Sequence, residues 1–255
     1  MIEVQAVKRC NEQAKLFPSD GELDDRFGNS VSISGAPGND IAIVGSPSDA
    51  DNGANSGSAY IYRKSGGIWV EEAKLLASDG AIGDFFGRSV SISGAPGNEI
   101  AIVGADGDNH SGMNENGSAY IYRFNGAVWV EEDKLLASDT APFDAFGDSV
   151  SIIGTLGNEV VIVGASGDGD NGLASGSVYI YRFNGVTWVE EQKLLASDGA
   201  DFDSFGSFVS ISGAPGNEVA IVGARDDDDN GAESGSVYIY RFNGATWNEE
   251  DKLLA

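Results

Sequence analysis

The sequence is poor in the residues that form covalent or metal cross-links. Among its 255 residues there is one cysteine, Cys10, and one histidine, His110. A single cysteine cannot form an intrachain disulfide, and these two residues cannot build a thiolate cluster or a multi-histidine metal centre. The common zinc sites are therefore excluded, and no organic cofactor motif is present.

Long apolar runs and positive charge are also scarce. No run reaches the roughly 18 apolar residues that a transmembrane helix needs, and the start of the chain lacks the layout of a secretion signal. Lys+Arg 15 against Asp+Glu 40 gives a formal net charge of -25. A surface this acidic repels phosphates and anionic lipid, so we expect neither nucleic-acid binding nor membrane insertion. It could attract divalent cations or a basic protein, or only confer solubility.

The chain contains a regular repeat. Its Phe-Gly pairs are spaced by 59, 60 and 59 residues and its tryptophans by 60, 59 and 59 residues. Periods of this size are typical of solenoids, propellers and other arrays. The positions are Phe27-Gly28, Phe86-Gly87, Phe146-Gly147 and Phe205-Gly206 for the pairs, and Trp69, Trp129, Trp188 and Trp247 for the tryptophans.

Each unit contains four short β signals. In the second unit residues 89–93 alternate serine with Val and Ile, which is the period of a strand. Residues 99–104 are almost all apolar, as in a strand covered on both faces. Residues 118–123 and 128–135 follow, separated by an Asn-Gly turn signal. We expect the apolar second strand inside each sheet and the tryptophan strand at its outer edge.

These signals predict an all-β fold, namely a β-propeller of four complete four-stranded blades in a single domain covering residues 1–255. A stacked solenoid is the alternative. The glycine of each Phe-Gly pair is expected where neighbouring blades crowd together at the axis. The predicted units are residues 27–85, 86–145, 146–204 and 205–255. Residues 1–26 are a partial copy, predicted to supply an extra N-terminal outer strand, with Cys10 in the tryptophan position, and a connecting loop.

The unit resembles the FG-GAP repeat, the propeller blade of integrin α-chain heads and of bacterial and algal surface proteins. The matching stretches in the second unit are Phe86-Gly87 with residues 89–92, then residues 102–105 and 117–122. The resemblance implies an extracellular or cell-surface module for binding or adhesion. Two features depart from it: family propellers usually have seven blades, and the family's calcium loop between the first two strands is replaced by a short Gly-Ala-Pro-Gly-Asn turn or its equivalents.

Acidic residues concentrate instead in the loop between the second and third strands. Hard cations such as Ca²⁺ take six to eight oxygen ligands from carboxylates and carbonyls, so these loops are candidate calcium sites. The alternative is a turn in which Asp and Asn bond their own backbone. The residues concerned are Asp49, Asp51, Asn52, Asp106, Asp108, Asn109, Asp168, Asp170, Asn171, Asp227, Asp229 and Asn230.

A second acidic loop precedes each Phe-Gly pair, and its last aspartates are Asp25, Asp84, Asp144 and Asp203. Four near-identical copies favour a structural task, with each carboxylate accepting backbone N–H groups. A catalytic site normally occurs once, so we expect no enzyme and no catalytic residues. The tryptophans and the Tyr-Ile-Tyr pairs are expected either to pack between blades or to form sugar-binding platforms.

The sequence therefore favours a non-catalytic, extracellular binding or adhesion propeller, with calcium as its possible support. A carbohydrate-binding propeller and a self-assembling structural unit are the alternatives. The partner is a protein or glycan of unknown identity. Homo-oligomers are expected through ring completion or edge-strand pairing, because an unprotected edge strand invites such pairing.

Overall fold

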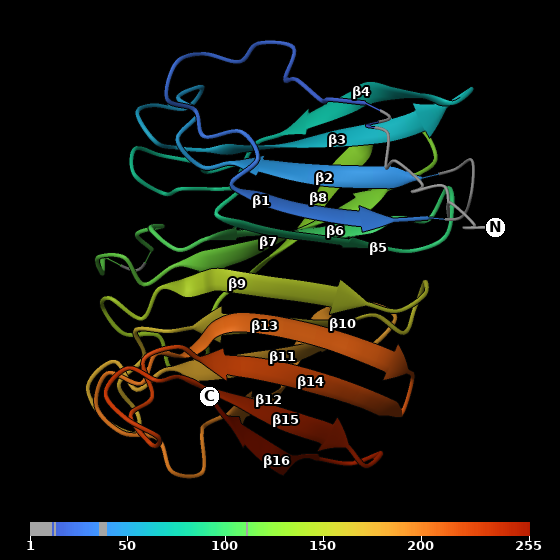
Figure 1. Cartoon of the computed structure of the whole chain (residues 1–255). Coiled ribbons are helices and arrows are strands. Elements are labelled where there is room, and N and C mark those ends of the chain that lie inside the picture. The colour runs from blue at the N-terminus through green and yellow to red at the C-terminus, as the bar shows by residue number, and fades with distance from the viewer. Residues whose placement is uncertain (1–11, 13, 36–39, 111) are drawn as a thin grey trace, which may run out of the picture.

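A computed structural model describes residues 12, 14–35, 40–110 and 112–255, and these residues form only strands, turns and loops (Figure 1). They contain no helix long and apolar enough to cross a membrane. The strands, grouped by blade, are β1 (Ser30–Ser34), β2 (Ile41–Ser46), β3 (Ser58–Ser65) and β4 (Ile68–Leu75); β5 (Ser89–Ser93), β6 (Ile100–Ala105), β7 (Ser118–Phe124) and β8 (Trp129–Leu135); β9 (Phe146–Ile153), β10 (Val160–Ala165), β11 (Ser177–Phe183) and β12 (Trp188–Leu194); β13 (Phe205–Ala214), β14 (Asn217–Ala224), β15 (Ser236–Phe242) and β16 (Trp247–Leu254).

Each blade is a four-stranded antiparallel meander in chain order, from β1-β2-β3-β4 to β13-β14-β15-β16. The second strand lies inside the sheet, and in blades 1 to 3 all six of its residues are buried. The tryptophan strand forms the outer edge. The predicted all-β propeller with four complete blades is therefore confirmed, and so is the predicted place of its strands.

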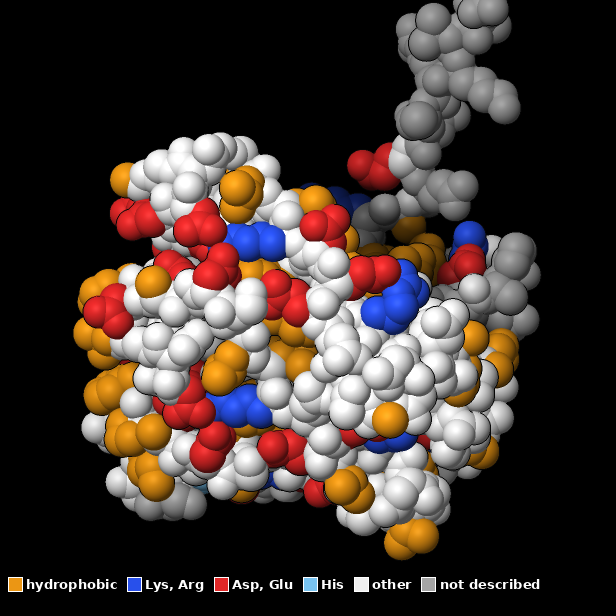
Figure 2. Space-filling view, turned by 90° about the horizontal axis from the view of Figure 1, so that it is seen from below, with side chains coloured by type: hydrophobic (Ala, Val, Ile, Leu, Met, Phe, Trp, Pro, Cys, Tyr) orange, Lys and Arg blue, Asp and Glu red, His pale blue; other side chains and the backbone are white. Residues whose placement is uncertain are grey.

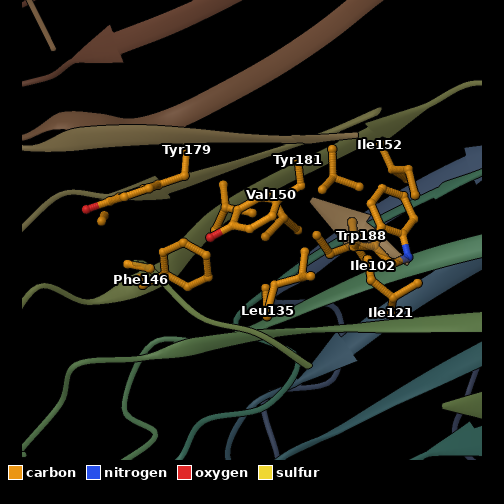
Figure 3. Packing of buried hydrophobic residues seen from close by; sticks show 14 of the residues in the cluster. Ile102, Ile121, Leu135, Phe146, Val150, Ile152, Tyr179, Tyr181 and Trp188 are labelled. Carbon is orange, nitrogen blue, oxygen red and sulfur yellow. The ribbon is translucent and has the colours of Figure 1, made fainter. Parts of the chain in front are cut away.

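Neighbouring blades pack through two different faces. The side of a blade that contacts the next blade, its outgoing face, carries aliphatic residues; in blade 2 these are Ile100, Ile102, Ala119, Ile121, Leu135 and Ala137. The side that contacts the preceding blade, its incoming face, is richer in aromatic residues; in blade 3 these are Phe146, Val150, Ile152, Tyr179, Tyr181 and Trp188 (Figure 3). The same two faces recur at the other two junctions. A blade therefore buries its faces only against its neighbours.

The glycines of the Phe-Gly pairs allow this close approach, as expected. A Cβ added to Gly147 would lie 2.3 Å from the carbonyl oxygen of Ser118 in the preceding blade, and one added to Gly104 would lie 2.0 Å from the carbonyl oxygen of Gly147. Such overlaps are far inside van der Waals contact. Gly147 also has φ 96, which other residues adopt only with strain. Glycine is therefore required on both sides of the junction.

The four blades form an open arc. In Figure 1 the innermost strands β1, β5, β9 and β13 follow one another, while blades 1 and 4 point to opposite sides. Within the described part of the chain, no strand pairing joins β13 to β1. The incoming face of blade 1 is open: Val31 and Ile33 are 68% and 67% exposed, whereas the equivalent Val90 and Ile92 are 5% and 4% exposed. The chain therefore does not close a four-bladed ring by itself.

The extra N-terminal strand was wrongly predicted for the residues that the structure describes. Cys10 lies outside them, and residues 12 and 14–18 belong to no strand. The segment instead follows the path of the loops that leave the other tryptophan strands. The carbonyl of Phe17 accepts a hydrogen bond from Tyr62 Oη at 2.8 Å, as the carbonyl of Leu76 accepts one from Tyr122 Oη in blade 2. With no sheet edge to pair with, this segment keeps only the contacts of the connecting loop.

Candidate functional site

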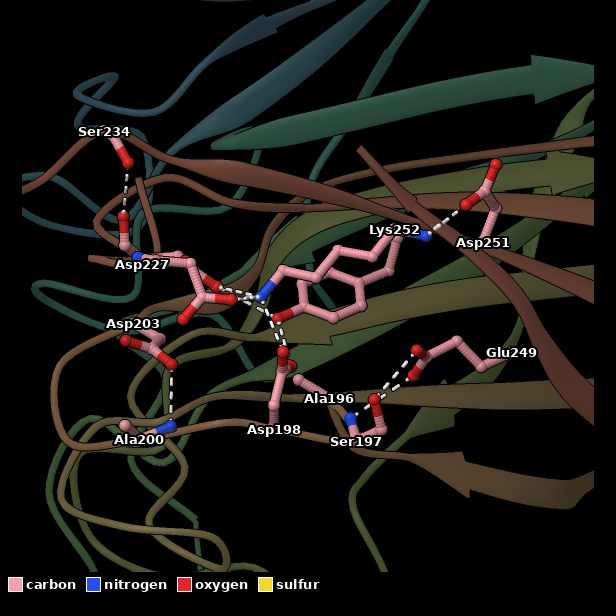
Figure 4. Close-up of polar contacts among 12 residues, drawn as sticks. Ala196, Ser197, Asp198, Ala200, Asp203, Asp227, Ser234, Glu249, Asp251 and Lys252 are labelled. Carbon is pink, nitrogen blue, oxygen red and sulfur yellow. Dashed lines mark hydrogen bonds and ion pairs between the residues drawn. The ribbon is translucent and has the colours of Figure 1, made fainter. Parts of the chain in front are cut away.

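The aspartates of the predicted calcium loops converge on a lysine of the outer strand. In blade 4, Lys252 Nζ lies 2.8, 2.9 and 2.6 Å from carboxylate oxygens of Asp198, Asp227 and Asp229 (Figure 4). Its ammonium group also lies 4.8 Å from the centre of the Tyr238 ring. The position that a cation would occupy among these carboxylates is therefore taken by the ammonium group of the chain itself.

The same lysine-centred cluster recurs in each blade. In every case one aspartate comes from the loop that precedes the blade, so the cluster joins a blade to the preceding segment of chain. Lys134 in blade 2 is bound by two carboxylates only, because His110 stands where the other blades have their third aspartate. The clusters are Lys74 with Asp20, Asp49 and Asp51; Lys134 with Asp79 and Asp108; Lys193 with Asp139, Asp168 and Asp170; and Lys252 with its three aspartates.

The first aspartate of the loop in blades 1, 3 and 4 has protein partners for both carboxylate oxygens. In blade 1, Asp49 Oδ1 accepts the Asp51 N–H at 3.1 Å, and its Oδ2 accepts bonds from Ser58 and Tyr60 besides contacting Lys74. The amide of Asn171 donates to the carbonyl of Ala196. Asn230 likewise donates to the carbonyl of Ala255. Asn52 uses its backbone N–H to reach Ser56, and Asn109 accepts from the Glu115 N–H.

No group of three or more His, Cys, Asp or Glu side chains in the described residues is arranged to hold a metal ion. The calcium sites stay a prediction, and an ion would have to displace a lysine. One residue of the predicted set lies elsewhere: Asp106 is outside the cluster of blade 2, whose equivalent of Asp49 is Asp108.

The charges of the clusters are strongly coupled. Burial alone would raise the pKa of the Asp139 carboxyl, but hydrogen bonds from Lys193 and Tyr179 hold it below its usual value. Burial would lower the pKa of Lys193, but its carboxylate partners raise it. A lowered aspartate pKa stabilises the fold above the unfolded value, and this contribution is lost as the pH falls through the folded value. On the surface, acidic side chains lie around basic ones in the same way (Figure 2).

The second acidic loop has the structural role that its repetition predicted. The carboxylate of Asp84 accepts the Ala81 N–H at 2.6 Å, and that of Asp144 accepts the Ala141 N–H at 2.6 Å. Asp25 and Asp203 make the same bond in their blades. Burial raises the pKa of Asp144 to about 6. These carboxylates hold the turn before each innermost strand.

The repeated aromatic residues pack at the junctions. Tyr179 and Tyr181 contact the ring of Phe146 edge-on, with ring centroids 5.4 and 6.2 Å apart. Trp188 is buried, and its Nε1 donates to Glu132 of the preceding blade at 3.0 Å. Trp129 and Trp247 make the same bond to Glu72 and Glu191. The tyrosines, Trp188 and Trp247 are buried and serve packing, whereas Trp129 is half-buried and Trp69 lies half-buried in an open apolar groove of blade 1.

A different site lies at the axis, where the four copies stop being alike. A polar cavity of about 350 Å³ is lined by the start of all four innermost strands. The residue after each Phe-Gly pair differs between blades and lines this cavity: Asn29, Arg88, Asp148 and Ser207. Arg225 and Phe208 of blade 4 also contribute to its wall. This cavity, named the axial pocket below, is the candidate ligand site.

Arg88 and Asp148 of the axial pocket are loosely paired, and Arg88 also contacts Asp106, which lies next to the pocket and does not line it. Arg88 Nε lies 3.5 Å from a carboxylate oxygen of Asp106 and 3.5 Å from one of Asp148. Asp106 Oδ1 is buried without a hydrogen-bond partner, and burial raises the pKa of this carboxyl to about 6. Phe208 stands where the other blades have serine and is 68% exposed. The repetition of the units does not reveal this site; the signal in the sequence is the position after each Phe-Gly pair, where the four repeats have four different residues.

Comparisons with solved structures show the propeller fold. The six-bladed β-propeller lectin of the fungus Aleuria aurantia matches with a TM-score of 0.52 and 12% identity over 89% of this chain and 64% of the lectin. The GH32 β-fructofuranosidase BmSUC1 of Bombyx mori matches with a TM-score of 0.52 and 16% identity over 86% of this chain and 47% of the enzyme. The chain thus spans less than two thirds of either protein. Since one is a lectin and the other an enzyme, the fold does not decide between binding and catalysis.

The sequence comparisons identify the repeat itself. No curated protein matches the chain. The family model of the FG-GAP repeat matches residues 10–62, 69–122, 129–181 and 188–240. The second, third and fourth matched units each start in an outer strand and end in the third strand of the following sheet, so each spans one junction, whereas the first unit starts before blade 1 and ends in its third strand. With four matched units and four corresponding sheets, the chain belongs to the FG-GAP repeat family.

Proposed function

We propose that this chain is a non-catalytic binding module, of the extracellular type that its family suggests, and that its ligand occupies the axial pocket. One observation carries the proposal: the side chains that follow the four Phe-Gly pairs differ from blade to blade, and all four line this cavity. Residues repeated in every blade are explained by packing or by the lysine-centred clusters. The residues Arg88 and Asp148 each occur at this position in one blade only; their charged groups lie 3.5 Å apart, and Asp148 also accepts a hydrogen bond from Ser166.

The lining fits a carbohydrate. Arg88 and Arg225 supply donors, Asp148 and Asn29 supply acceptors, and the exposed ring of Phe208 offers an apolar face. A sugar presents hydroxyl groups at its edge and C–H groups on its faces, so it can use all three kinds of group. The opposite charges in the pocket and the net charge of -25 favour an uncharged ligand over an anionic one.

The absence of catalysis is part of the proposal. Burial raises the pKa of Asp84, Asp144 and Asp203, but each of these carboxylates holds the same turn in its own blade. The blade-specific acids Asp106 and Asp148 could serve a glycosidase in principle, because such enzymes use two carboxyl groups. However, Arg88 Nε lies 3.5 Å from an oxygen of each carboxylate, so a guanidinium group stands between the two acids, where a glycosidase would place the bond to be cleaved.

A glycan array probed with the labelled full chain tests the proposal. We expect binding to a subset of neutral glycans, without hydrolysis of the bound glycans. Arg88→Gln and Asp148→Asn should each lower the affinity about tenfold, since a hydrogen bond to a charged group contributes about 1.5–3 kcal/mol. Lys15→Gln changes an exposed charge outside the pocket and should bind like the parent chain. No binding, or equal binding by all variants, would overturn the proposal.

A further inference from the structure

The outgoing face of blade 4 contains an empty socket. A cavity of about 350 Å³ lies on this face. It is lined mainly by small and aliphatic residues, including Gly223, Gly235, Val237, Leu253 and Leu254. Their equivalents in blade 1 are Gly45, Gly57, Ala59, Leu75 and Leu76. In blade 1 that place is filled, because Phe86 of the next blade pairs with Gly57 and is fully buried.

The three interior junctions show what such a socket accepts. Gly57, Gly117 and Gly176 each form a parallel bridge with the phenylalanine of the following Phe-Gly pair. A Cβ on any of these glycines would lie 2.0 to 2.1 Å from the carbonyl oxygen of that phenylalanine. At Gly235 the nearest atom belongs to Arg225 of the same blade, at 3.0 Å. The socket of blade 4 is therefore shaped for a Phe-Gly pair that no other part of the described chain supplies.

The incoming face of blade 1 offers that Phe-Gly pair. Phe27 is only half-buried, whereas its three equivalents are fully buried. A Cβ added to Gly28 would meet nothing within 4 Å. Beside them lies an apolar groove of about 380 Å³, lined by residues that include Leu16, Val31, Ile33, Val44 and Trp69. This face has the composition of a blade that follows another blade.

Polar groups at the two ends match as well. At each interior junction an arginine of the third strand bonds a buried glutamate of the next blade: Arg63 to Glu99, Arg123 to Glu159 and Arg182 to Glu218. The fourth arginine, Arg241, pairs with Glu250 of its own outer strand and remains 44% exposed at its side chain. The residue of blade 1 equivalent to Glu99 is Asp40. A second copy of the chain can therefore supply a carboxylate to Arg241.

We propose that the outgoing face of blade 4 binds the incoming face of blade 1 of a second copy, and that two copies close one ring through two such junctions. The first and last blades of the arc point to opposite sides (Figure 1), so one further arc completes a turn. Two copies give eight blades, which lies within the usual range of propellers. Because the two faces differ, the contact repeats head to tail. It gives a closed ring only if the rotation from one copy to the next is half a turn, and otherwise it gives an open series of copies.

Two residues make this junction weaker than the interior ones. Lys64 stands where blades 2, 3 and 4 have Phe124, Phe183 and Phe242, over which the preceding arginine stacks. Arg241 would therefore meet a second cation beside Asp40. Phe208 replaces the serine whose hydroxyl bonds the glycine carbonyl of the next Phe-Gly pair, as Ser89 bonds Gly147. The assembly should accordingly dissociate on dilution.

Sedimentation equilibrium of the full chain over a range of concentrations tests the proposal. We expect a reversible equilibrium between one chain of 26.5 kDa and two chains. Ile33→Asp and Ile221→Asp place a charge on the incoming and the outgoing free face, and each should raise the dissociation constant at least tenfold. Val186→Asp, at an 87% exposed hairpin position, is the matched control and should leave it unchanged. A single chain at all concentrations, an open series of larger masses, or a dimer insensitive to both face variants would overturn the proposal.

Mixing and charge reversal show whether the two faces meet. The Ile33→Asp variant keeps an intact outgoing face on blade 4, and the Ile221→Asp variant keeps an intact incoming face on blade 1. A mixture of the two variants can form one intact junction, so it should form dimers that neither variant forms alone. Arg241→Glu or Asp40→Arg alone should raise the dissociation constant about tenfold, and the two together in one chain should largely restore it. Absence of mixed dimers, or of any rescue, would contradict the contact between these faces.

Discussion

The junction between blades 2 and 3 and the incoming face of blade 1 are built from the same kinds of residue, yet only the junction is closed. Gly147 and Gly28 have nearly the same φ, 96 and 93. Around Gly147 the backbone of blade 2 leaves no room for a Cβ, whereas Gly28 faces open space. The same contrast separates Ile152 from Ile33 and Ile162 from Ile221.

This comparison shows where the stability of the array resides. A single blade is one sheet, and it cannot cover either of its own two apolar faces. The residue types that suit a junction are present in every blade, but they stabilise only where a neighbour covers them. How strongly a substitution affects stability therefore depends on whether the blade has a neighbour on that side, as well as on the position of the residue within the repeat.

The largest difference is expected for glycine replacement. Gly147→Ala and Gly28→Ala impose the same backbone strain, of about 1 kcal/mol. Only Gly147→Ala also forces a methyl group against the Ser118 carbonyl, so we expect a loss of roughly 3–5 kcal/mol in the free energy of unfolding. Urea denaturation of the single chain at low concentration measures both. Equal losses for the two variants would show that the junction does not impose the requirement for glycine.

The buried ion pairs should show the next largest contrast. Glu159 is almost fully buried and bonds Arg123 of the preceding blade, while Asp40 occupies the equivalent position at the open end. Glu159→Gln leaves the guanidinium group without its buried carboxylate and should lower the free energy of unfolding by about 3 kcal/mol. Asp40→Asn should change it by less than about 0.5 kcal/mol under conditions that keep the chain monomeric. A large loss from Asp40→Asn would mean that blade 1 is already covered.

The lysine-centred clusters provide a third contrast. Lys193 joins blade 3 to the loop leaving blade 2, but Lys74 joins blade 1 only to the N-terminal segment. Lys193→Met leaves three carboxylates together and should lower the free energy of unfolding by about 2–3 kcal/mol. Lys74→Met should mainly release the segment that carries Asp20 and affect global unfolding less. Chemical denaturation with hydrogen exchange distinguishes the two effects.

The same variants test the calcium prediction. In the parent chain the ammonium group occupies the place between the carboxylates, so adding Ca²⁺ or a chelator should not shift the melting temperature. Lys193→Met leaves Asp139, Asp168 and Asp170 without their cation, and Ca²⁺ should then restore part of the lost stability. Lys134→Met leaves only two carboxylates and is the control with a weaker response. A shift of the parent chain by Ca²⁺ would show that the ion binds in spite of the lysines.

The fold could be read from the sequence because its periodicity is global. Four phenylalanine–glycine pairs and four tryptophans fix the repeat, and the apolar stretch of residues 99–104 identifies the strand inside the sheet. The lone N-terminal strand was wrong because residues 14–16 have the composition of an outer strand but no sheet edge to join. A pattern of residue types identifies a strand only when its pairing partner exists.

The candidate sites were harder to predict, for physical reasons. In the sequence each acidic loop stands alone, whereas its cation is a lysine from the outer strand, 25 residues away between Asp168 and Lys193. Asp106 was aligned with Asp49, although Asp108 follows Gly104 by four residues just as Asp49 follows Gly45; the extra residue of the blade 2 loop lies after Asp108. Predicting the axial pocket requires knowing how each blade is rotated relative to the next, because this rotation brings positions about 60 residues apart to one axis. The sequence alone shows only that equivalent positions carry different residues, such as Arg88 and Asp148.

The smallest effect has the opposite sign and concerns the axial end of an interior junction. Burial raises the pKa of Asp106 to about 6, above its unfolded value, so this group stabilises the fold when protonated and the contribution is lost as the pH rises through 6. Asp106→Asn should therefore increase the free energy of unfolding at pH near 7.5 by about 1 kcal/mol, less than the full shift implies because a contact with Arg88 is lost. The gain should vanish towards pH near 4.

Asp226 of blade 4 is the control; it follows Arg225, the blade 4 residue that stands at the position of Asp106. It pairs with Arg225 and Ser204, and although burial opposes ionisation, these partners hold the pKa of its carboxyl below the usual value. Asp226→Asn should therefore lower stability slightly at neutral pH, opposite to Asp106→Asn. Thermal melts of both variants between pH 4 and pH 8 measure the two slopes. If Asp106→Asn were also destabilising at neutral pH, its attraction to Arg88 would outweigh its burial, and Asp106 would not differ from Asp226 in this respect.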